Sequence, residues 1–131
     1  MQRTHKIRLM PNNKQATYLA RCCGVARFAY NWGLARWKEQ YEVHKANPEA
    51  NPLPNQYDLR KQLNQIKREQ FPWMLEVTKC APQQAIINLG RAFGNFFKKN
   101  SNYPQFKKKR DGQVEVTLDK LVCHQMIVLH Y

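Results

Sequence analysis

Apolar and polar residues alternate near the start of the chain, over residues 5–10. Ile7 and Leu9 share one face of this segment, while Lys6 and Arg8 share the other. Alternation with a period of two is typical of a strand. The pattern therefore predicts a short N-terminal strand that ends before Pro11.

The apolar pattern then changes to helical spacing. Asn12 lies three residues before Gln15, which is the arrangement of a helix N-cap. Apolar side chains recur every three or four residues along one face: Leu19, Cys23, Ala26, Tyr30, Leu34, Trp37 and Tyr41. This predicts a first helix to about residue 44, with Gly24 as a candidate kink.

Two further helices follow a loop at residues 47–55, which contains three prolines and three asparagines. Asn55 caps a second helix that runs to about residue 68. A third helix is predicted from about residue 78 to about residue 99, with Pro82 in its first turn, where a missing N–H costs little. The aromatic side chains expected in the core are Tyr30, Trp32, Trp37, Phe93, Phe96 and Phe97. Three amphipathic helices with short connections predict a small bundle.

The C-terminal part of the chain has a different pattern. Residues 98–110 hold six Lys or Arg and no acid, broken by Pro104 and small polar residues, which predicts a flexible basic arm. Residues 113–119 alternate as a strand, and the apolar stretch 121–131 is a candidate second strand. The predicted fold class is mainly α (α+β): a three-helix bundle flanked by a short N-terminal strand and an incomplete C-terminal β segment.

Charge is distributed unevenly along the 131 residues. The chain has a net charge of +13, with 22 Lys plus Arg against 9 Asp plus Glu. Residues 1–112 carry 21 of the basic and 7 of the acidic residues, whereas the last 19 residues carry 1 and 2. Such an excess of positive charge repels itself in a compact fold and indicates a polyanionic partner.

Several functional classes are not expected from the composition. The four cysteines form no CxxC pair, which favours free thiols in a reducing cytoplasm, and the four histidines are scattered. No metal site and no cofactor are predicted. The N-terminus lacks the apolar core of a signal peptide, and no apolar run approaches the roughly 20 residues of a spanning helix. The acids lie mostly on exposed helix faces, so no catalytic residue is predicted.

The basic arm and the second helix carry the strongest charge signals. In the arm, cationic side chains are candidates to neutralise phosphates: Lys98, Lys99, Lys107, Lys108, Lys109 and Arg110. Tyr103 and Phe106 between them are candidates to stack on bases. The second helix carries a basic stripe around Asn64: Arg60, Lys61, Lys67 and Arg68. The alternative for both regions is an ordinary solvated run of charges.

The start of the third helix is the remaining candidate site. A helix N-terminus offers unpaired backbone N–H groups and a favourable field for phosphate. Lys79 adds a mobile positive charge there, and the amide of Gln83 is suited to a bidentate pair with adenine. Ordinary exposed polar residues early in a helix are the alternative.

Three blocks of sequence occur in an informative order. They are HKIRLMPNNKQ at residues 5–15, GVARFAYNWGLARWKEQYE at 24–42, and the run from FPWMLEVTKCAPQQAIINLG at 71–90 into the basic arm. This order resembles the N-terminal part of the TnpB/OrfB proteins of bacterial insertion sequences, RNA-guided nucleases related to type V CRISPR effectors. The resemblance covers about residues 5–112.

In proteins of that family the start of the helix that corresponds to the third predicted helix lies against the DNA duplex that borders the target, and it reads a short motif there. The resemblance therefore implies base-reading roles for Lys79, Gln83 and Gln84, with Tyr57 as a weaker candidate.

The same resemblance implies guide-RNA contacts for Lys6 and Arg8 on the first strand. Arg27 and Asn31 match the family's most recognisable helix pattern. Because they are four residues apart on one helix face, they are placed to clamp a backbone phosphate or a partner loop.

By this resemblance the chain divides into four parts. Residues 1–11 form the N-terminal strand of a partial barrel, 12–99 a helical recognition domain with a helix-turn-helix, 100–112 the basic arm, and 113–131 a divergent tail. The tail lacks the family's Ser-Phe-containing strand, which suggests a frameshift or an early stop. The family's RuvC-like acids are absent from the chain.

The predicted function is nucleic-acid binding by the N-terminal fragment of a TnpB-like RNA-guided endonuclease or transposase, without its catalytic domain. The implied partners are DNA and a guide RNA in the bacterial cytoplasm, near the nucleoid, with no membrane partner. Three alternatives stay open: a stand-alone regulator that competes with full-length copies, half of a split nuclease completed by a catalytic-half polypeptide, and a non-functional remnant.

Overall fold

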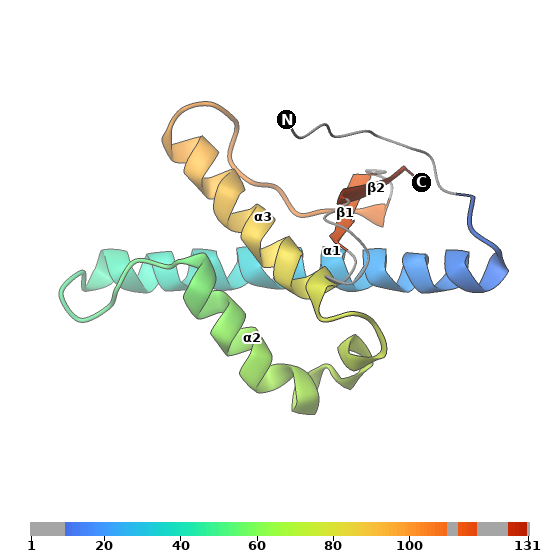
Figure 1. The fold of residues 1–131 in the computed structure, drawn as a ribbon. Helices are drawn as coiled ribbons and strands as arrows, with labels where there is room; N and C mark the ends of the chain where they lie inside the picture. The colour runs from blue at the N-terminus through green and yellow to red at the C-terminus, as the bar shows by residue number, and fades with distance from the viewer. Residues whose placement is uncertain (1–9, 110–112, 118–125, 131) are drawn as a thin grey trace, which may run out of the picture.

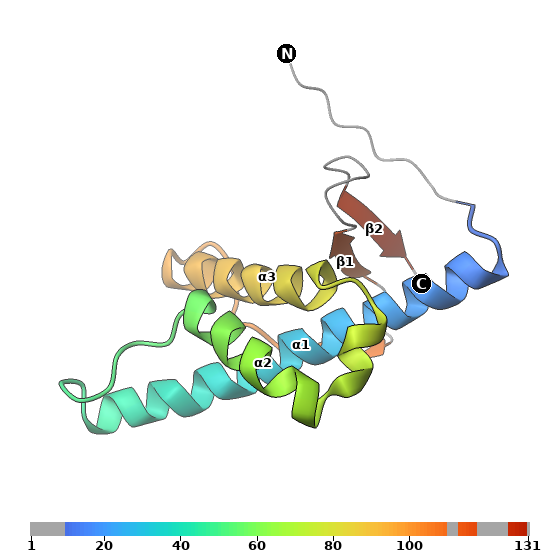
Figure 2. The same cartoon turned by 60° about the horizontal axis from the view of Figure 1, so that its bottom comes forward.

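The computed structural model of the chain describes residues 10–109, 113–117 and 126–130 (Figure 1). The elements follow in the order α1, α2, a short 3-10 helix η1, α3, β1 and β2. α1 extends along the whole molecule, and α2 and α3 both lie across it (Figures 1 and 2). The described chain is mainly helical, which confirms that part of the predicted fold class.

α1 is one uninterrupted helix, Asn13–Ala46. The side chain of Asn12 accepts a hydrogen bond from the Gln15 N–H at 2.9 Å, and the side chain of Gln15 accepts one from the Asn12 N–H at 3.0 Å. This reciprocal capping box satisfies two backbone donors at the helix start. The predicted start is confirmed, and the helix passes Gly24 without a break.

α2 spans Gln56–Gln70, and the side-chain oxygen of Asn55 caps it by accepting from the Asp58 N–H at 3.0 Å. The 3-10 helix η1, Pro72–Glu76, then turns the chain toward α3, Cys80–Phe97. Each helix boundary lies within about two residues of its prediction, which is the usual uncertainty of helix ends.

α3 ends in a Schellman motif. Lys99 has a positive φ of 60°. Its N–H donates to the carbonyl of Phe96 at 2.9 Å, and the Asn100 N–H donates to the carbonyl of Asn95 at 2.9 Å. A left-handed residue at this position satisfies the last carbonyls of a helix, and glycine usually occupies it. Here a lysine does so.

The core lies mainly between α1 and α3, whose contact is the most extensive in the fold. Gly33 allows the close approach, because a Cβ there would come within 2.8 Å of Ile86 Cδ1 and 2.9 Å of Leu89 Cδ2. One turn further along α1, the ring of Trp37 stacks on Phe93 with 4.3 Å between centroids. Each large apolar side chain buried at this seam stabilises the fold by about 1.5–3 kcal/mol.

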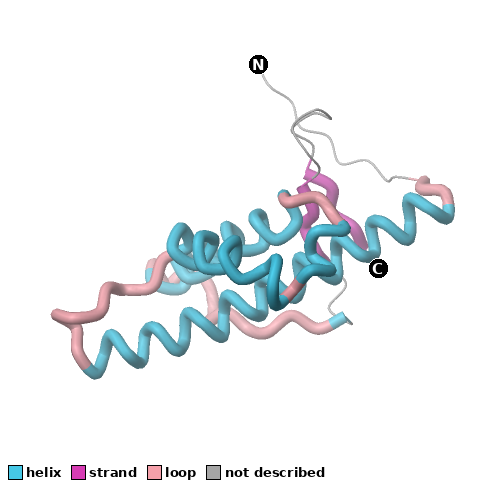
Figure 3. The backbone as a smooth tube through the Cα atoms, turned by 90° about the horizontal axis from the view of Figure 1, so that it is seen from below, coloured by secondary structure: helices cyan, strands magenta, loops and turns pink. Residues whose placement is uncertain are grey.

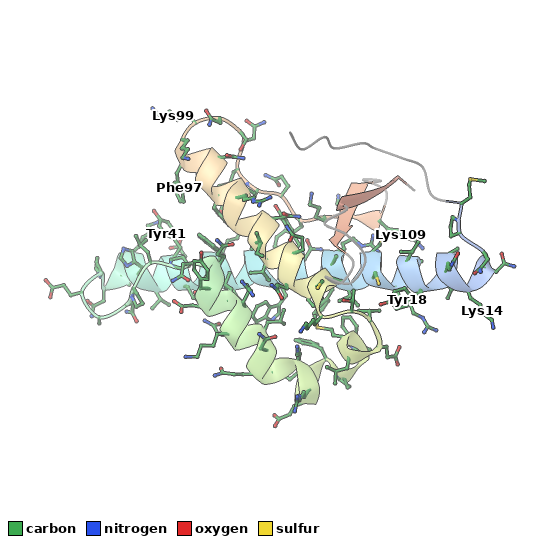
Figure 4. All side chains as sticks on the ribbon, viewed as in Figure 1. Lys14, Tyr18, Tyr41, Phe97, Lys99 and Lys109 are labelled. Atoms are coloured by element: carbon green, nitrogen blue, oxygen red, sulfur yellow. The ribbon has the colours of Figure 1, made fainter. Side chains whose placement is uncertain are left out.

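Most of the predicted aromatic core is confirmed. Tyr30, Trp37 and Phe93 are buried, and Trp32 packs half-buried against the core. The prediction is wrong for Phe97, which is 63% exposed. Phe97 is the last residue of α3 and its ring contacts only neighbouring rings of the same helix among the described aromatic pairs (Figure 4).

Two short strands follow the helices. β1, Gln113–Thr117, pairs antiparallel with β2, Met126–His130. β1 lies beside α1 and α3, on the outside of the helical layer (Figure 3). Residues 5–9 of the predicted N-terminal strand lie outside the described residues, and the assignment of the strands to a partial barrel stays a prediction.

Candidate nucleic-acid interface

A groove of about 230 Å³ lies between α2 and the start of α3. Its polar lining comes from both helices and includes Arg60, Asn64, Lys67, Lys79 and Gln83. Its apolar floor is formed by Leu63, Pro82 and Ile86. We call this the basic groove, because among the described residues that line it none is acidic.

Local helix geometry explains how the basic groove forms. Arg60, Asn64 and Lys67 follow one another at three- and four-residue spacing, so they share one face of α2. The buried Leu63 and Ile86 join this face to α3. Lys79 is exposed at the start of α3, and Gln83 is exposed one turn later. The fold thus brings together residues from two of the separately predicted candidate regions.

The backbone at the start of α3 differs from the prediction. The Cys80 N–H donates to Thr78 Oγ1 at 3.3 Å, and the Ala81 N–H donates to the Thr78 carbonyl at 3.2 Å. The Gln83 N–H reaches the Lys79 carbonyl at 3.4 Å, and Pro82 has no N–H. The expected set of unpaired N–H groups is therefore wrong, and side chains must provide any phosphate contact here.

Other predicted residues of this region lie outside the basic groove. Lys61 and Arg68 are exposed on α2 but do not line the groove. Tyr57 is 69% exposed in the first turn of α2. Gln84 donates from Nε2 to Asn88 Oδ1 at 3.0 Å, which engages its amide along α3.

The basic arm is attached to α1. Asn31 Nδ2 donates to the Lys107 carbonyl at 2.9 Å, and Asn31 Oδ1 accepts from the Lys107 N–H at 2.7 Å. The ammonium of Lys38 lies 5.6 Å from the ring centre of Tyr103 and 4.7 Å from that of Phe106, within cation–π range. The prediction of a flexible arm is wrong for its described part, because these contacts hold it.

This attachment changes the roles of two predicted residues. The amide of Asn31 is occupied by the chain's own arm, so the partner loop expected there is internal. Tyr103 packs edge-on against Phe93 and Phe96, with centroid distances of 5.6 and 5.1 Å, and is 38% exposed. Its ring is partly occupied, which limits its use as a stacking platform. Arg27 is half-buried on the same side of α1 as Asn31.

The remaining predicted cations are spread over the molecule. Lys98 and Lys99 are exposed at the end of α3, whereas Lys109 lies beside α1 (Figure 4). Lys107 and Lys108 are also exposed in the arm, and the ammonium of Lys107 lies 5.0 Å from the ring centre of Tyr30. Arg8 and Arg110 lie outside the described residues.

Lys38 and Tyr18 were not predicted to have a role. Lys38 holds the arm, and the Tyr18 hydroxyl accepts a hydrogen bond from the Thr78 N–H at 3.0 Å, just before α3. Both contacts join residues more than 50 positions apart, so local spacing carries no signal for them. The one available signal is a lysine or a tyrosine on the exposed side of an amphipathic helix, which is too common to be selective.

The described residues were also compared with the requirements of reactive thiols, metal sites and membrane-spanning helices. Cys22 and Cys23 form no disulfide, and burial raises the pKa of both thiols, so both stay protonated at neutral pH. Within residues 10–109 and the two strands, no group of three His, Cys, Asp or Glu side chains is placed to hold a metal ion. No described helix is long and apolar enough to cross a membrane.

Comparison with known proteins identifies relatives of the chain. The helix-turn-helix domain model of the OrfB proteins of the IS605 type matches residues 1–46. In this structure residues 13–46 of that segment form the single helix α1.

The virulence protein VsdF of Salmonella dublin is 33% identical over 83% of this chain and 95% of its own length. Two longer relatives are named "Putative RNA-guided DNA endonuclease". The one from Streptomyces pristinaespiralis is 32% identical over 84% of the chain, and InsQ of Escherichia coli (strain K12) is 31% identical over 79%. The chain spans about a quarter of these two relatives, 26% and 25% of their length. The chain therefore belongs to the TnpB/OrfB family of insertion-sequence proteins and corresponds to the family's N-terminal region.

Proposed function

We propose that the chain is the nucleic-acid-recognition segment of a TnpB-like RNA-guided DNA endonuclease or transposase. The observation that carries the proposal is the convergence of Arg60, Lys67, Lys79 and Gln83 in the basic groove. Cations on an apolar floor attract a polyanion, and an amide among them adds a group able to distinguish bases.

The target-adjacent DNA duplex is the ligand proposed for the basic groove. Arg60, Lys67 and Lys79 neutralise backbone phosphates and position the duplex, because phosphate contacts set register without reading sequence. The exposed amide of Gln83 contributes a donor and an acceptor to one base edge, and adenine presents the matching pair in the major groove.

A guide RNA is the second proposed partner. Its phosphates are assigned to Arg8, Arg27 and the cations of the basic arm and its start: Lys98, Lys99, Lys107, Lys108, Lys109 and Arg110. DNA cleavage, the activity named for two relatives, is assigned to groups outside this chain, so the chain contributes recognition. The described members of this set, Arg27, Lys98, Lys99 and Lys107 to Lys109, do not line the basic groove, so the two nucleic acids are assigned to different surfaces.

A pair of double variants tests the proposal. We expect Lys67→Ala with Lys79→Ala to weaken binding of a short labelled DNA duplex at least about tenfold at about 0.1 M salt, by removing two phosphate contacts. The magnitude of the salt slope should fall by about 1.8. Lys14→Ala with Lys45→Ala removes the same charge from exposed sites outside the groove and should have a smaller effect. Equal losses in both variants would overturn the assignment to the groove.

A stand-alone binder that competes with nuclease relatives is the second candidate. It is supported by VsdF, which the chain matches over 95% of that protein's length, so a relative of similar extent exists. This candidate predicts that the purified chain displaces a longer relative from duplex DNA without a second polypeptide. Failure to compete at concentrations that saturate the duplex would exclude it.

A further inference from the structure

A second groove lies on the opposite flank of α2, between α2 and α1. α1 lines it with Trp32, Arg36 and Gln40, which recur every four residues on one helix face. α2 lines it with Gln62, Gln65, Ile66 and Gln70. We call it the amide groove, because four of its side chains are glutamines.

The two helices face each other in antiparallel order across this groove. Gln40 Nε2 donates to Gln62 Oε1 at 3.1 Å and closes one end. Along α1 toward its N-terminus the lining continues with Arg36 and Trp32, while along α2 toward its C-terminus it continues with Gln65 and Gln70. α1 and α2 make fewer contacts than α1 and α3, so the flank stays open.

The chemistry of the amide groove differs from that of the basic groove. Trp32 is half-buried against the core and lines the groove, so it provides an apolar aromatic surface held in place by packing. Gln65 and Gln70 are exposed, and each amide presents both a donor and an acceptor. Arg36 is the single cation among the lining residues; its partner Glu39, at 2.9 Å, is exposed. An exposed ion pair is weak and exchanges readily.

From this arrangement we infer that the amide groove binds an unpaired nucleotide. A base has a flat face for the indole of Trp32 and an edge of donors and acceptors that side-chain amides can match, because each amide carries both kinds of group. A duplex offers no free base face, because its bases are stacked, and it exposes base edges only inside its grooves. The single Arg36 suits one phosphate.

The inference deepens the proposed function and rests on it, since it requires a nucleic-acid partner. Both grooves share α2, whose diameter with side chains is about 10–12 Å. A strand whose duplex part occupies the basic groove therefore reaches the amide groove within a few nucleotides. The second groove thus adds contacts to unpaired bases beside a duplex contact.

Binding of labelled oligonucleotides of about 12 nucleotides, a length within the usual range for single-strand sites, tests the inference. RNA and DNA of one sequence are compared with a hairpin duplex. We expect Gln65→Ala with Gln70→Ala to weaken single-strand binding about tenfold and duplex binding less than about twofold. Asn13→Ala with Asn95→Ala removes two exposed amides from helices outside both grooves and should change neither.

Trp32 provides a separate test of stacking. Trp32→Ala should weaken single-strand binding about tenfold, whereas Trp32→Phe should retain most of it, because a phenyl ring still stacks. Thermal melting by circular dichroism shows whether each variant is folded. If Trp32→Ala is unfolded, the double variant Gln65→Ala with Gln70→Ala decides whether the amide groove binds the single strand.

The outcomes distinguish failure of the amide-groove assignment from failure of the proposed function. Single-strand binding that is unchanged in the glutamine variant, or absent while the duplex still binds, overturns the amide groove and leaves the proposed function standing. No binding of any nucleic acid overturns both. A larger effect on the RNA oligonucleotide identifies RNA as the source of the unpaired base, and a larger effect on DNA identifies the target strand.

Discussion

The two flanks of α2 face neighbouring helices but offer opposite chemistry. Toward α3 the lining carries Arg60, Lys67 and Lys79, whereas toward α1 it carries glutamines, one tryptophan and Arg36. The first flank suits phosphates, and the second suits the faces and edges of bases. One 15-residue helix thus presents two chemically different flanks, because residues three or four apart share a face and their immediate neighbours do not.

The two flanks also differ in how the core supports them. The basic groove has a floor of buried Leu63 and Ile86, which belong to the same core as the α1–α3 seam. The amide groove lies where α1 and α2 have few contacts, closed at one end by the Gln40–Gln62 hydrogen bond. We infer that the basic groove is the more rigid of the two.

The largest expected effect is a loss of fold stability, which would disturb both flanks of α2 together. Gly33→Val should lower the free energy of unfolding by about 2–3 kcal/mol, because its side chain would overlap Ile86 and Leu89 at the seam. Chemical denaturation measures the loss. Gly24→Val is the matched control in the same helix: a Cβ there meets open space, so its effect should be below about 0.5 kcal/mol. Similar losses in both variants would contradict a packing role specific to Gly33.

The next largest effect is a difference between the two grooves in how strongly salt weakens their binding of nucleic acid. When salt is raised from about 50 to about 200 mM, three phosphate contacts in the basic groove should cost about 40-fold in duplex affinity. One contact at Arg36 should cost only about threefold in single-strand affinity. Other cations of the chain add to both values, so the difference between slopes is the measured quantity. Equal slopes for the two ligands would remove the distinction between the grooves.

A smaller effect tests whether the basic arm is independent of both grooves. With 3.6 residues per turn, Asn31 lies almost opposite Arg36 and Gln40 on α1. Asn31→Ala removes both hydrogen bonds to Lys107 and should speed tryptic cleavage of the arm about tenfold, equivalent to about 1.4 kcal/mol. Limited proteolysis measures this rate.

Asn31→Asp is the conservative comparison, since it keeps the acceptor for the Lys107 N–H and loses the donor. Its cleavage rate should lie between those of the parent and Asn31→Ala. If the arm of Asn31→Ala is cleaved at the parent rate, the hydrogen bonds do not hold it.

The smallest effect concerns the end of α3. Lys99→Gly should raise the free energy of unfolding by about 0.5–1 kcal/mol, because glycine adopts a positive φ without steric cost. Lys98→Gly removes the same charge at a residue with a φ of −79° and should not stabilise the fold. Thermal melts of the two variants give the comparison, and a stabilisation shared by both would trace to charge.

Local features of the fold follow directly from the sequence. The caps at Asn12 and Asn55 and the three helices were predicted, because capping and apolar periodicity depend on residues within one or two turns. The prediction failed at the start of α3, where Thr78 and Pro82 together remove the expected free N–H groups. It failed also for the arm, whose partners Asn31 and Lys38 lie about 70 residues away.

The sequence by itself determined the positive charge and the helical segments, and it supplied the candidate residues for nucleic-acid contact. Which of those residues meet in one groove was decided only by the tertiary structure. Lys67 and Lys79 come together because α2 and α3 pack through Leu63 and Ile86, and the glutamines of α2 face Trp32 because the loop at 47–55 brings α2 back across α1. Spacing along one helix is set by local geometry, whereas register between helices depends on side chains far apart in the chain.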